Sequence, residues 1–383
     1  MTKENQPTLQ EEPLRSVFTA GLPEIFAQLN ISLVVSTYQA GKVILVRHDA
    51  DGGAPASDGS SGTMNTHFRT FDKPMGIAAQ GNQLAIGGKK TVWTLHNMPA
   101  AARKLEPVGK HDACYLTRRI HITGDIDIHE MAYATHDHAG GELWLVNTRF
   151  GCLCTLDADH SFHPRWRPPF VSAYAPEDRC HLNGLAMVDG RPKYVTALGE
   201  TDSAGGWRQN KADGGLLMDI DTNEILLRGL SMPHSPRWYQ DRLWFLESGQ
   251  GSLAYVDLAA ARHSPFTVHT VAQLPGFTRG LDFYGPLAFI GLSQVRESAT
   301  FSSLPLMERL GEERTCGVWV VHIETGQTLG FLRFEAGVQE IFAVQVLPNT
   351  RFPEILEWDD ERLAHSYVLP DAALAETPLV EMA

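Results

Sequence analysis

The sequence lacks long hydrophobic runs. No stretch approaches the ~18 consecutive apolar residues that indicate a membrane-spanning helix. Residues 1–14 are polar and acidic, without the basic and apolar regions of a secretory signal. We therefore expect a cytoplasmic protein that has no membrane partner.

Cysteine is also scarce. The chain has 5 cysteines among its 383 residues, an odd number that is widely spread. Such a pattern indicates free thiols in a reducing compartment rather than a disulfide framework. Cys152 and Cys154 lie two residues apart, but no second pair at zinc-finger spacing follows them.

Basic residues are outnumbered by acidic ones. Lys and Arg together number 32 and Asp and Glu 45, which gives a net charge of −13. An acidic chain repels the phosphate backbone, so we expect no nucleic-acid partner. Gly (34) and Pro (22) are too few for a disordered chain. Length alone, at ~150 residues per domain, favours two to three domains.

Internal repeats change that expectation. Pairs of short β-rich runs, each split by a turn, recur along the chain; residues 143–147 with 152–157, and 243–247 with 252–257, are two examples. This pattern is typical of antiparallel hairpins. A third run precedes each pair, and its second position is Met75, His129, Asn183, His234, Arg279 or Gln339 in turn. The intervals between these positions are 54, 54, 51, 45 and 60 residues, a period that indicates a β-propeller.

The two ends of the chain complement each other. The sixth run, near the C-terminus, has no hairpin after it, whereas residues 33–37 and 42–46 form a hairpin with no run before it. Joining them closes the ring without an exposed sheet edge. We therefore predict an all-β fold, a six-bladed β-propeller closed by pairing N-terminal strands with the C-terminal inner strand. Its expected boundaries are an N-terminal extension over residues 1–30 with an amphipathic helix within 16–30, the propeller over 31–356 and a tail over 357–383.

The repeat register also predicts a site. The innermost strand of each blade lines the central channel, and ligands of propellers usually bind where loops cluster at one face. Residues far apart in sequence should therefore meet at the channel mouth. The predicted members are the following: His129, Asn183, His234, Arg279 and Gln339 from the second positions, Glu130 and Glu340 from the third, and Asn147 and Glu247 from the ends of second strands.

These side chains suit several kinds of chemistry. His129 and His234 could act as general bases, with Glu130 or Glu340 as further acid–base groups. Alternatively, His129, His234 and Asn183 could hold a divalent metal such as Zn, Mn or Ca.

In the ligand-binding part of this prediction, Arg279 would clamp a carboxylate or phosphate. The remaining members expected to contact the ligand are Asn147, Asn183, Glu247 and Gln339.

Seven longer strings carry a resemblance to a known family. They are residues 36–41, 124–131, 146–150, 176–186, 196–202, 232–237 and 275–280. With them the sequence resembles a bacterial family catalogued as a conserved hypothetical protein with a domain of unknown function. This resemblance implies a cytoplasmic propeller-like protein and transfers no catalytic residue. In architecture alone the chain is similar to gluconolactonase/regucalcin-type propellers, which hold a divalent metal with Glu, Asn and Asp, whereas the ring here is rich in His.

The sequence leaves three functions open. The first is a polar ligand site at the channel mouth, with metal-assisted hydrolase, lyase or isomerase chemistry on a small polar or anionic molecule. The alternative is a non-catalytic propeller that binds a peptide or protein partner on one face. The third is a ligand sensor that uses the same pocket as the first. The sequence assigns no role to the insertions at residues 199–214 and 298–314, and no oligomeric state.

Overall fold

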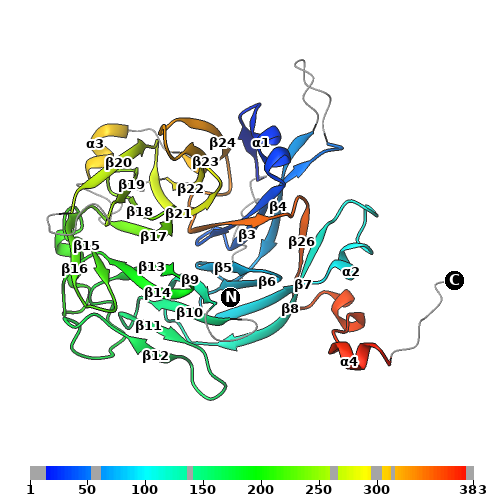
Figure 1. Ribbon diagram of the computed structural model, residues 1–383, viewed down its shortest axis with the longest axis horizontal. Helices are drawn as coiled ribbons and strands as arrows, with labels where there is room; N and C mark the ends of the chain where they lie inside the picture. Colours follow the sequence, from blue (N-terminus) through cyan, green and yellow to red (C-terminus); the bar gives the residue numbers. More distant parts are fainter. Residues whose placement is uncertain are drawn as a thin grey trace, which may run out of the picture.

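The computed structural model describes residues 14–52, 62–135, 141–258, 266–294, 304–311 and 315–376. Six β-sheets stand around a common axis as the blades of a propeller (Figure 1). Consecutive inner strands β5, β9, β13, β17, β21 and β25 contact one another, and β25 contacts β5 to complete the ring. The predicted all-β, six-bladed fold is therefore confirmed.

Three blades follow the chain without interruption, because short turns are enough to connect antiparallel neighbours. Blade 3 consists of β9 (Ile128–Ala134), β10 (Glu142–Asn147), β11 (Cys152–Thr155) and β12 (His163–Trp166). Blade 4 consists of β13 (Leu182–Val188), β14 (Arg191–Ala197), β15 (Gly215–Asp219) and β16 (Ile225–Leu230). Blade 5 consists of β17 (Pro233–Tyr239), β18 (Arg242–Glu247), β19 (Ser252–Val256) and β20 (Val268–Gln273).

Two blades carry a fifth strand at the outer edge. Blade 2 consists of β5 (Ile77–Gln80), β6 (Gln83–Gly87), β7 (Thr91–Asn97), β8 (Ala113–Ile122) and the parallel strand β26 (Pro353–Leu356). Blade 6 consists of β21 (Phe277–Tyr284), β22 (Leu287–Ser293), β23 (Cys316–His322), β24 (Thr328–Phe334) and β1 (Ser16–Phe18). Both chain ends thus cover sheet edges that would otherwise be unpaired.

Blade 1 closes the ring with strands from both ends of the chain. Its strands are β25 (Ala343–Pro348), β2 (Ile31–Thr37), β3 (Lys42–Asp49) and β4 (Thr63–Thr70). Ile31 pairs with Pro348 and Ser36 with Ala343 in an antiparallel ladder. The predicted closure of N-terminal strands on the C-terminal inner strand is confirmed.

The N-terminal extension differs in part from the predicted amphipathic helix. Helix α1 spans Leu22–Leu29 and begins at a turn with Pro23 in its first positions, where proline favours a helix start. The residues before it form β1 instead, since Val17 and Phe18 pair with the edge of β24. The edge of blade 6 thus overrides the helical spacing of the apolar residues.

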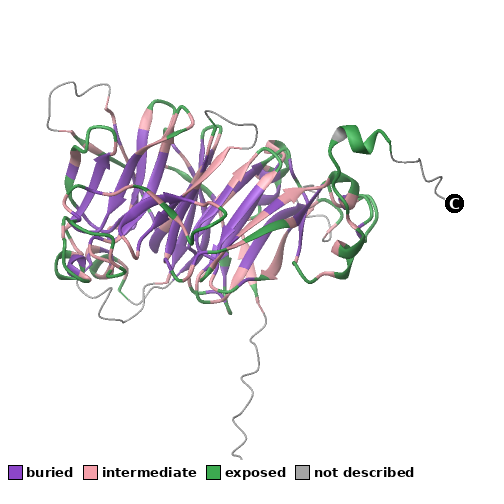
Figure 2. Ribbon diagram, turned by 90° about the horizontal axis from the view of Figure 1, so that it is seen from below, coloured by how far each residue is buried: buried purple, intermediate pink, exposed green. Residues whose placement is uncertain are grey.

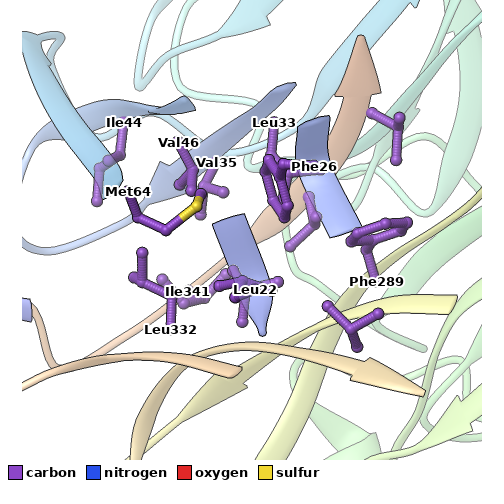
Figure 3. Close-up of a cluster of buried hydrophobic side chains, with 14 of the residues drawn as sticks. Leu22, Phe26, Leu33, Val35, Ile44, Val46, Met64, Phe289, Leu332 and Ile341 are labelled. Atoms are coloured by element: carbon purple, nitrogen blue, oxygen red, sulfur yellow. The ribbon is translucent and has the colours of Figure 1, made fainter. Parts of the chain in front are cut away.

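The core lies between adjacent blades, where the buried residues run through the strands (Figure 2). Figure 3 shows the cluster between α1 and blades 1 and 6. The rings of Phe26 and Phe289 meet edge to face with centres 6.2 Å apart. Burying a phenylalanine stabilises a fold by ~1.5–3 kcal/mol. This contact therefore anchors α1 on the ring.

The other helices are short and lie outside the blades. They are α2 (Pro99–Ala102), α3 (Pro305–Leu310), α4 (Asp371–Leu374) and the 3-10 helices η1 (Gly206–Asn210) and η2 (Glu361–His365). Among the described residues, no helix has the length and apolar character needed to cross a membrane. Residues 1–13 of the extension, 377–383 of the tail and parts of the insertion at 298–314 lie outside the described residues.

Candidate functional site

The inner strands begin at one end of the propeller, which we call the channel mouth. Four of these strands are bulged near their starts: β9 at His129 and Glu130, β13 at Asn183, β17 after His234, and β21 at Arg279 and Gly280. Gly280 has φ +81°, and a Cβ there would lie 2.7 Å from the backbone nitrogen of Val344. A β-bulge re-aims side chains, which orients residues at the strand starts.

An imidazole–carboxylate pair stands before β13. His181 Nδ1 lies 2.9 Å from one Asp178 carboxylate oxygen and 3.0 Å from the other. A carboxylate only accepts hydrogen bonds, so Nδ1 carries the proton and the lone pair of the neutral ring is at Nε2. Trp207, from η1, donates its indole N–H to Asp178 over 2.9 Å and packs on the His181 ring at 4.3 Å between centres. The insertion at residues 199–214 thus fixes the pair.

His129 lies directly against this pair. Its ring centre is 4.6 Å from that of His181 and 5.1 Å from that of Phe342. The Nδ1 atom of His129 donates to the backbone carbonyl of Asp127 over 3.2 Å. Burial holds the pKa of His129 well below its usual value, and the charges of His181 and Arg279 act in the same direction. This imidazole is therefore neutral near pH 7.

Arg279 forms the opposite wall of the mouth. Its guanidinium carbon lies 3.5 Å from the centre of the Phe342 ring, a close cation–π contact. Among the described residues its ion pair is with Glu340, at 3.7 Å, which is too long for a hydrogen bond. The side chain is 13% exposed. Most of its donors are therefore available to a ligand.

Asp127 lies near both the His181 imidazole and the Arg279 guanidinium. One of its carboxylate oxygens is 3.8 Å from His129 Nδ1. Burial raises the pKa of Asp127, while the nearby His181 and Arg279 favour its charged form. We call Asp127, His129, Asp178, His181, Trp207, Arg279 and Phe342 the mouth cluster.

His234 lies on β17, the inner strand of blade 5. Its Nδ1 atom donates to the backbone carbonyl of Met232 over 2.9 Å and is 3.0 Å from the Ser248 hydroxyl. Burial holds the pKa of His234 well below its usual value, and the charge of Arg279 contributes. His234 is 3% exposed, and its Nδ1 atom is used within the protein.

Glu130, a predicted acid–base group, is held in a buried ion pair. Arg237 donates to its two carboxylate oxygens over 3.0 and 3.1 Å. The pKa of Arg237 is raised although burial opposes this, because the Glu130 carboxylate stabilises the charge. This pair lies deeper in the channel than the mouth cluster, since both side chains come after His129 and His234 on β9 and β17.

The two predicted asparagines are bound to neighbouring protein groups. Asn183 donates to the carbonyl of Pro233 on the next blade over 3.0 Å and accepts from the Thr196 hydroxyl over 2.7 Å. Asn147 is fully buried and accepts the backbone N–H of Phe150 over 3.0 Å. In the structure, Asn183 links two blades and Asn147 holds a turn.

Glu247, Gln339 and Glu340 lie at the same end of the ring. Glu247 accepts the backbone N–H of Ser231 over 2.9 Å, and burial raises its pKa. Gln339 is exposed, and its backbone carbonyl accepts from Gln294. Of these three residues, Glu340 is the one in contact with the mouth cluster, through Arg279.

The mouth cluster is carried by an unusual backbone. Asp127, Asp178, His181 and Met232 have φ of 56°, 49°, 51° and 49°, in the left-handed region. Such conformations are uncommon for residues other than glycine and cost of order 1–3 kcal/mol each. Strained positions of this kind cluster at functional sites, so their presence before three consecutive inner strands, β9, β13 and β17, supports a site here.

No metal arrangement is evident in this geometry. Among the residues that the structure describes, no group of three or more His, Cys, Asp or Glu side chains is placed to hold an ion. The metal set of His129, His234 and Asn183 therefore stays a prediction.

Five members of the mouth cluster were absent from the predicted set: Asp127, Asp178, His181, Trp207 and Phe342. The string at residues 176–186 contained the available signal, because Asp and His are among the residues that tolerate a left-handed backbone. Trp207 comes from an insertion outside the repeat register, so the repeat could not place it.

The comparisons identify a family and a fold. A family model described as "Domain of unknown function (DUF4915)" matches residues 20–356. No curated protein matches this chain. A chain in the crystal structure of a nidogen/laminin complex is similar with a TM-score of 0.50 and 9% identity, over 84% of this chain and 99% of that chain. At that identity the likeness shows the fold alone.

Two further solved structures are less similar. A protein of unknown function from Bacteroides caccae has a TM-score of 0.46 and 9% identity, over 83% of this chain and 98% of that one. Virginiamycin B lyase from Staphylococcus aureus has a TM-score of 0.37 and 8% identity, over 84% and 98%.

Proposed function

This chain belongs to the family described as domain of unknown function DUF4915, and we propose that its channel mouth binds a small organic anion and moves a proton on it. The observation that carries the proposal is the Asp178–His181 pair facing Arg279 across His129 and Phe342. A base oriented by a carboxylate, opposite an underused cation, suits proton abstraction next to a carboxylate group.

Residues of the mouth cluster account for each proton and for the electron pair in the proposed step. His181 takes a proton from the ligand at Nε2, and the Asp178 carboxylate stabilises the imidazolium that forms. The electron pair of the broken C–H bond stays on the ligand, where Arg279 stabilises the developing negative charge. Asp127, whose pKa is raised by burial, returns a proton to another position of the ligand. Protonation of another carbon of the ligand makes the reaction an isomerisation. In a lyase reaction the electron pair would instead form a double bond to the neighbouring carbon, the bond from that carbon to the leaving group would break, and Asp127 would protonate the leaving group.

A metal-assisted form of the reaction is the second candidate for the chemistry. His129 and His234 each use Nδ1 on a backbone carbonyl, which leaves Nε2 as a potential ligand atom. That arrangement is usual for metal-binding imidazoles and supports the expectation of Zn, Mn or Ca. For the whole protein we propose a bacterial origin and a cytoplasmic location, and the five buried free cysteines support the cytoplasmic location.

The test uses solvent exchange. Wild-type protein in D2O is incubated with lactate, pyruvate, malonate, succinate and citrate, and loss of C–H signal is followed by NMR. We expect exchange in at least one of them and a loss of about 10²-fold or more in His181→Gln, the contribution of a general base. His160→Gln is the matched control, because His160 faces Asp157 three residues before it at 3.0 Å but is exposed.

Binding is measured separately by calorimetry with the same acids. We expect Arg279→Gln to weaken binding about 10- to 100-fold, since hydrogen bonds to charged groups contribute ~1.5–3 kcal/mol. No binding and no exchange with any acid would overturn the proposal. If Arg279→Gln binds the acids as tightly as the wild type does, Arg279 does not bind the anion.

A further inference from the structure

A second pocket lies outside the ring, apart from the channel. It has a volume of about 350 Å³ and is bounded by α2, by β8 and by the C-terminal segment around η2. Figure 1 shows these elements together at the outer edge of blade 2. Volumes of ~300–1,000 Å³ are typical of small-molecule sites, so this pocket suits a ligand at the lower end of that range.

The floor of the pocket is apolar. Leu105, Leu116 and Leu356 line it and belong to one buried cluster, which continues beneath it to Cys114. Met98, at the start of α2, adds a flexible apolar side chain to the wall. The floor therefore offers a surface for a hydrocarbon chain.

The rim of the pocket is basic. Lys104, Arg118, Arg362 and His365 line it, and none of the lining residues is acidic, although the chain carries a net charge of −13. Arg362 is paired with Asp360. Within the described part of the chain, neither Lys104 nor Arg118 forms an ion pair, so two cations at the rim lack a counter-charge.

A β-bulge places Arg118 at this rim. In the ladder between β7 and β8, Thr94 is opposite Arg119 and Leu95 is opposite Thr117, which leaves Arg118 as the extra residue. A bulge re-aims the side chain of the inserted residue. Its neighbour Arg119 is also exposed but does not line the pocket.

We propose that this pocket binds an amphipathic carboxylate, a free acyl chain of medium length. The hydrocarbon chain would lie on the leucine floor, and the carboxylate would pair with Lys104 and Arg118. The concave shape favours a single small molecule over a membrane surface, because the floor lies between α2 and the segment around η2. This site is independent of the function proposed for the channel mouth.

The experiment titrates the full-length chain with decanoate by calorimetry, below the concentration at which decanoate forms micelles. Decanol is the neutral probe of the same chain length. The test variant is the double substitution Lys104→Gln with Arg118→Gln. The matched control is the double substitution Arg103→Gln with Arg119→Gln. These exposed arginines are the sequence neighbours of Lys104 and Arg118, respectively, and neither lines the pocket.

We expect decanoate to bind the wild type and the control with equal affinity and the test variant at least 10-fold more weakly, with decanol weak in all three. The urea midpoints of the variants check that folding is unchanged. Absence of decanoate binding, an equal loss in both double variants, or equal binding of decanol would overturn the proposal. So would charge-dependent binding to phosphatidylglycerol vesicles without binding of free decanoate.

Discussion

Replacing Glu130 by Gln removes the counter-charge of Arg237 inside the channel. The two side chains are 5% and 21% exposed and share two hydrogen bonds. The substitution keeps the shape of the side chain and one acceptor oxygen. Its main effect is therefore to leave the guanidinium buried without the carboxylate that balances it.

The magnitude follows from the burial of the pair. Removing one partner of a buried ion pair costs ~3–5 kcal/mol. Arg237 retains some contact with solvent, which favours the lower end of that range. Asp282 also faces Arg237, and its pKa is raised to about 6 by burial, with the charge of Glu130 contributing. Loss of Glu130 would favour ionisation of Asp282, so we expect a cost of about 3 kcal/mol.

Urea unfolding measures this cost, as the product of the slope and the shift in midpoint. The companion variants are Arg237→Met and the double variant Glu130→Gln, Arg237→Met. The double variant should lose less free energy of unfolding than the sum of the losses in the two single variants. Asp125→Asn is the control, because its ion pair with Arg149 at 2.9 Å is exposed. We expect that change to cost ~0–1 kcal/mol.

Two results would refute this reasoning. Either single variant could cost less than about 1 kcal/mol, in the range of an exposed pair. Alternatively, the double variant could equal the sum of the single changes within about 0.5 kcal/mol, as for independent sites. Glu130 would then be free for the acid–base role predicted from the sequence.

Three further predictions concern protons and metals. The pKa of Glu354 is lowered to about 2 despite burial, through its hydrogen bond with His67. The wild type should therefore be more stable than Glu354→Gln, with the full difference present above pH 4.5. Urea unfolding should show that this difference shrinks by up to about 3 kcal/mol as the pH falls to 2. Because the pKa of Asp127 is raised, affinity for an organic anion should increase as the pH falls, and calorimetry should find a weaker pH dependence in Asp127→Asn. The metal-assisted form of the proposal predicts that elemental analysis finds a stoichiometric divalent metal that is lost in the His129→Ala, His234→Ala double variant; no metal in the wild type would contradict that form.

The ring was predictable from the sequence because each blade repeats the same local pattern. Hairpin turns and alternating apolar residues recur at a fixed period, and each local choice agrees with the whole fold. The same register brought His129, Arg279 and Glu340 to one end of the channel. Strands β1 and β26 were not predictable, since three or four residues gain strand structure only by pairing with an edge that the tertiary fold provides.

The partners within the site were less accessible to sequence reasoning. Glu130 follows His129, and sequence adjacency suggested that they act together. Its partner in the structure is Arg237, two blades away in the ring. His181 precedes its strand in a left-handed conformation, which alternation along a strand does not describe. Periodicity thus predicts which residues reach the channel, and the pairing among them depends on backbone direction.

The charges at the mouth decide whether an anion fits there. Asp127 and Glu340 both lie near the guanidinium of Arg279, and Asp178 lies near Asp127. Asp178 is largely neutralised, because His181, Trp207 and Arg208 all contact its oxygens.

Glu340 is too far from Arg279 to satisfy its donors. Asp127 and Glu340 are therefore the carboxylates that would repel an anion, and burial favours the neutral form of Asp127. An anion that displaces water from the mouth would raise this pKa further, so its binding and the protonation of Asp127 favour each other. The proton taken up on binding is then the one available for donation, which links recognition of the ligand to the chemistry proposed for it.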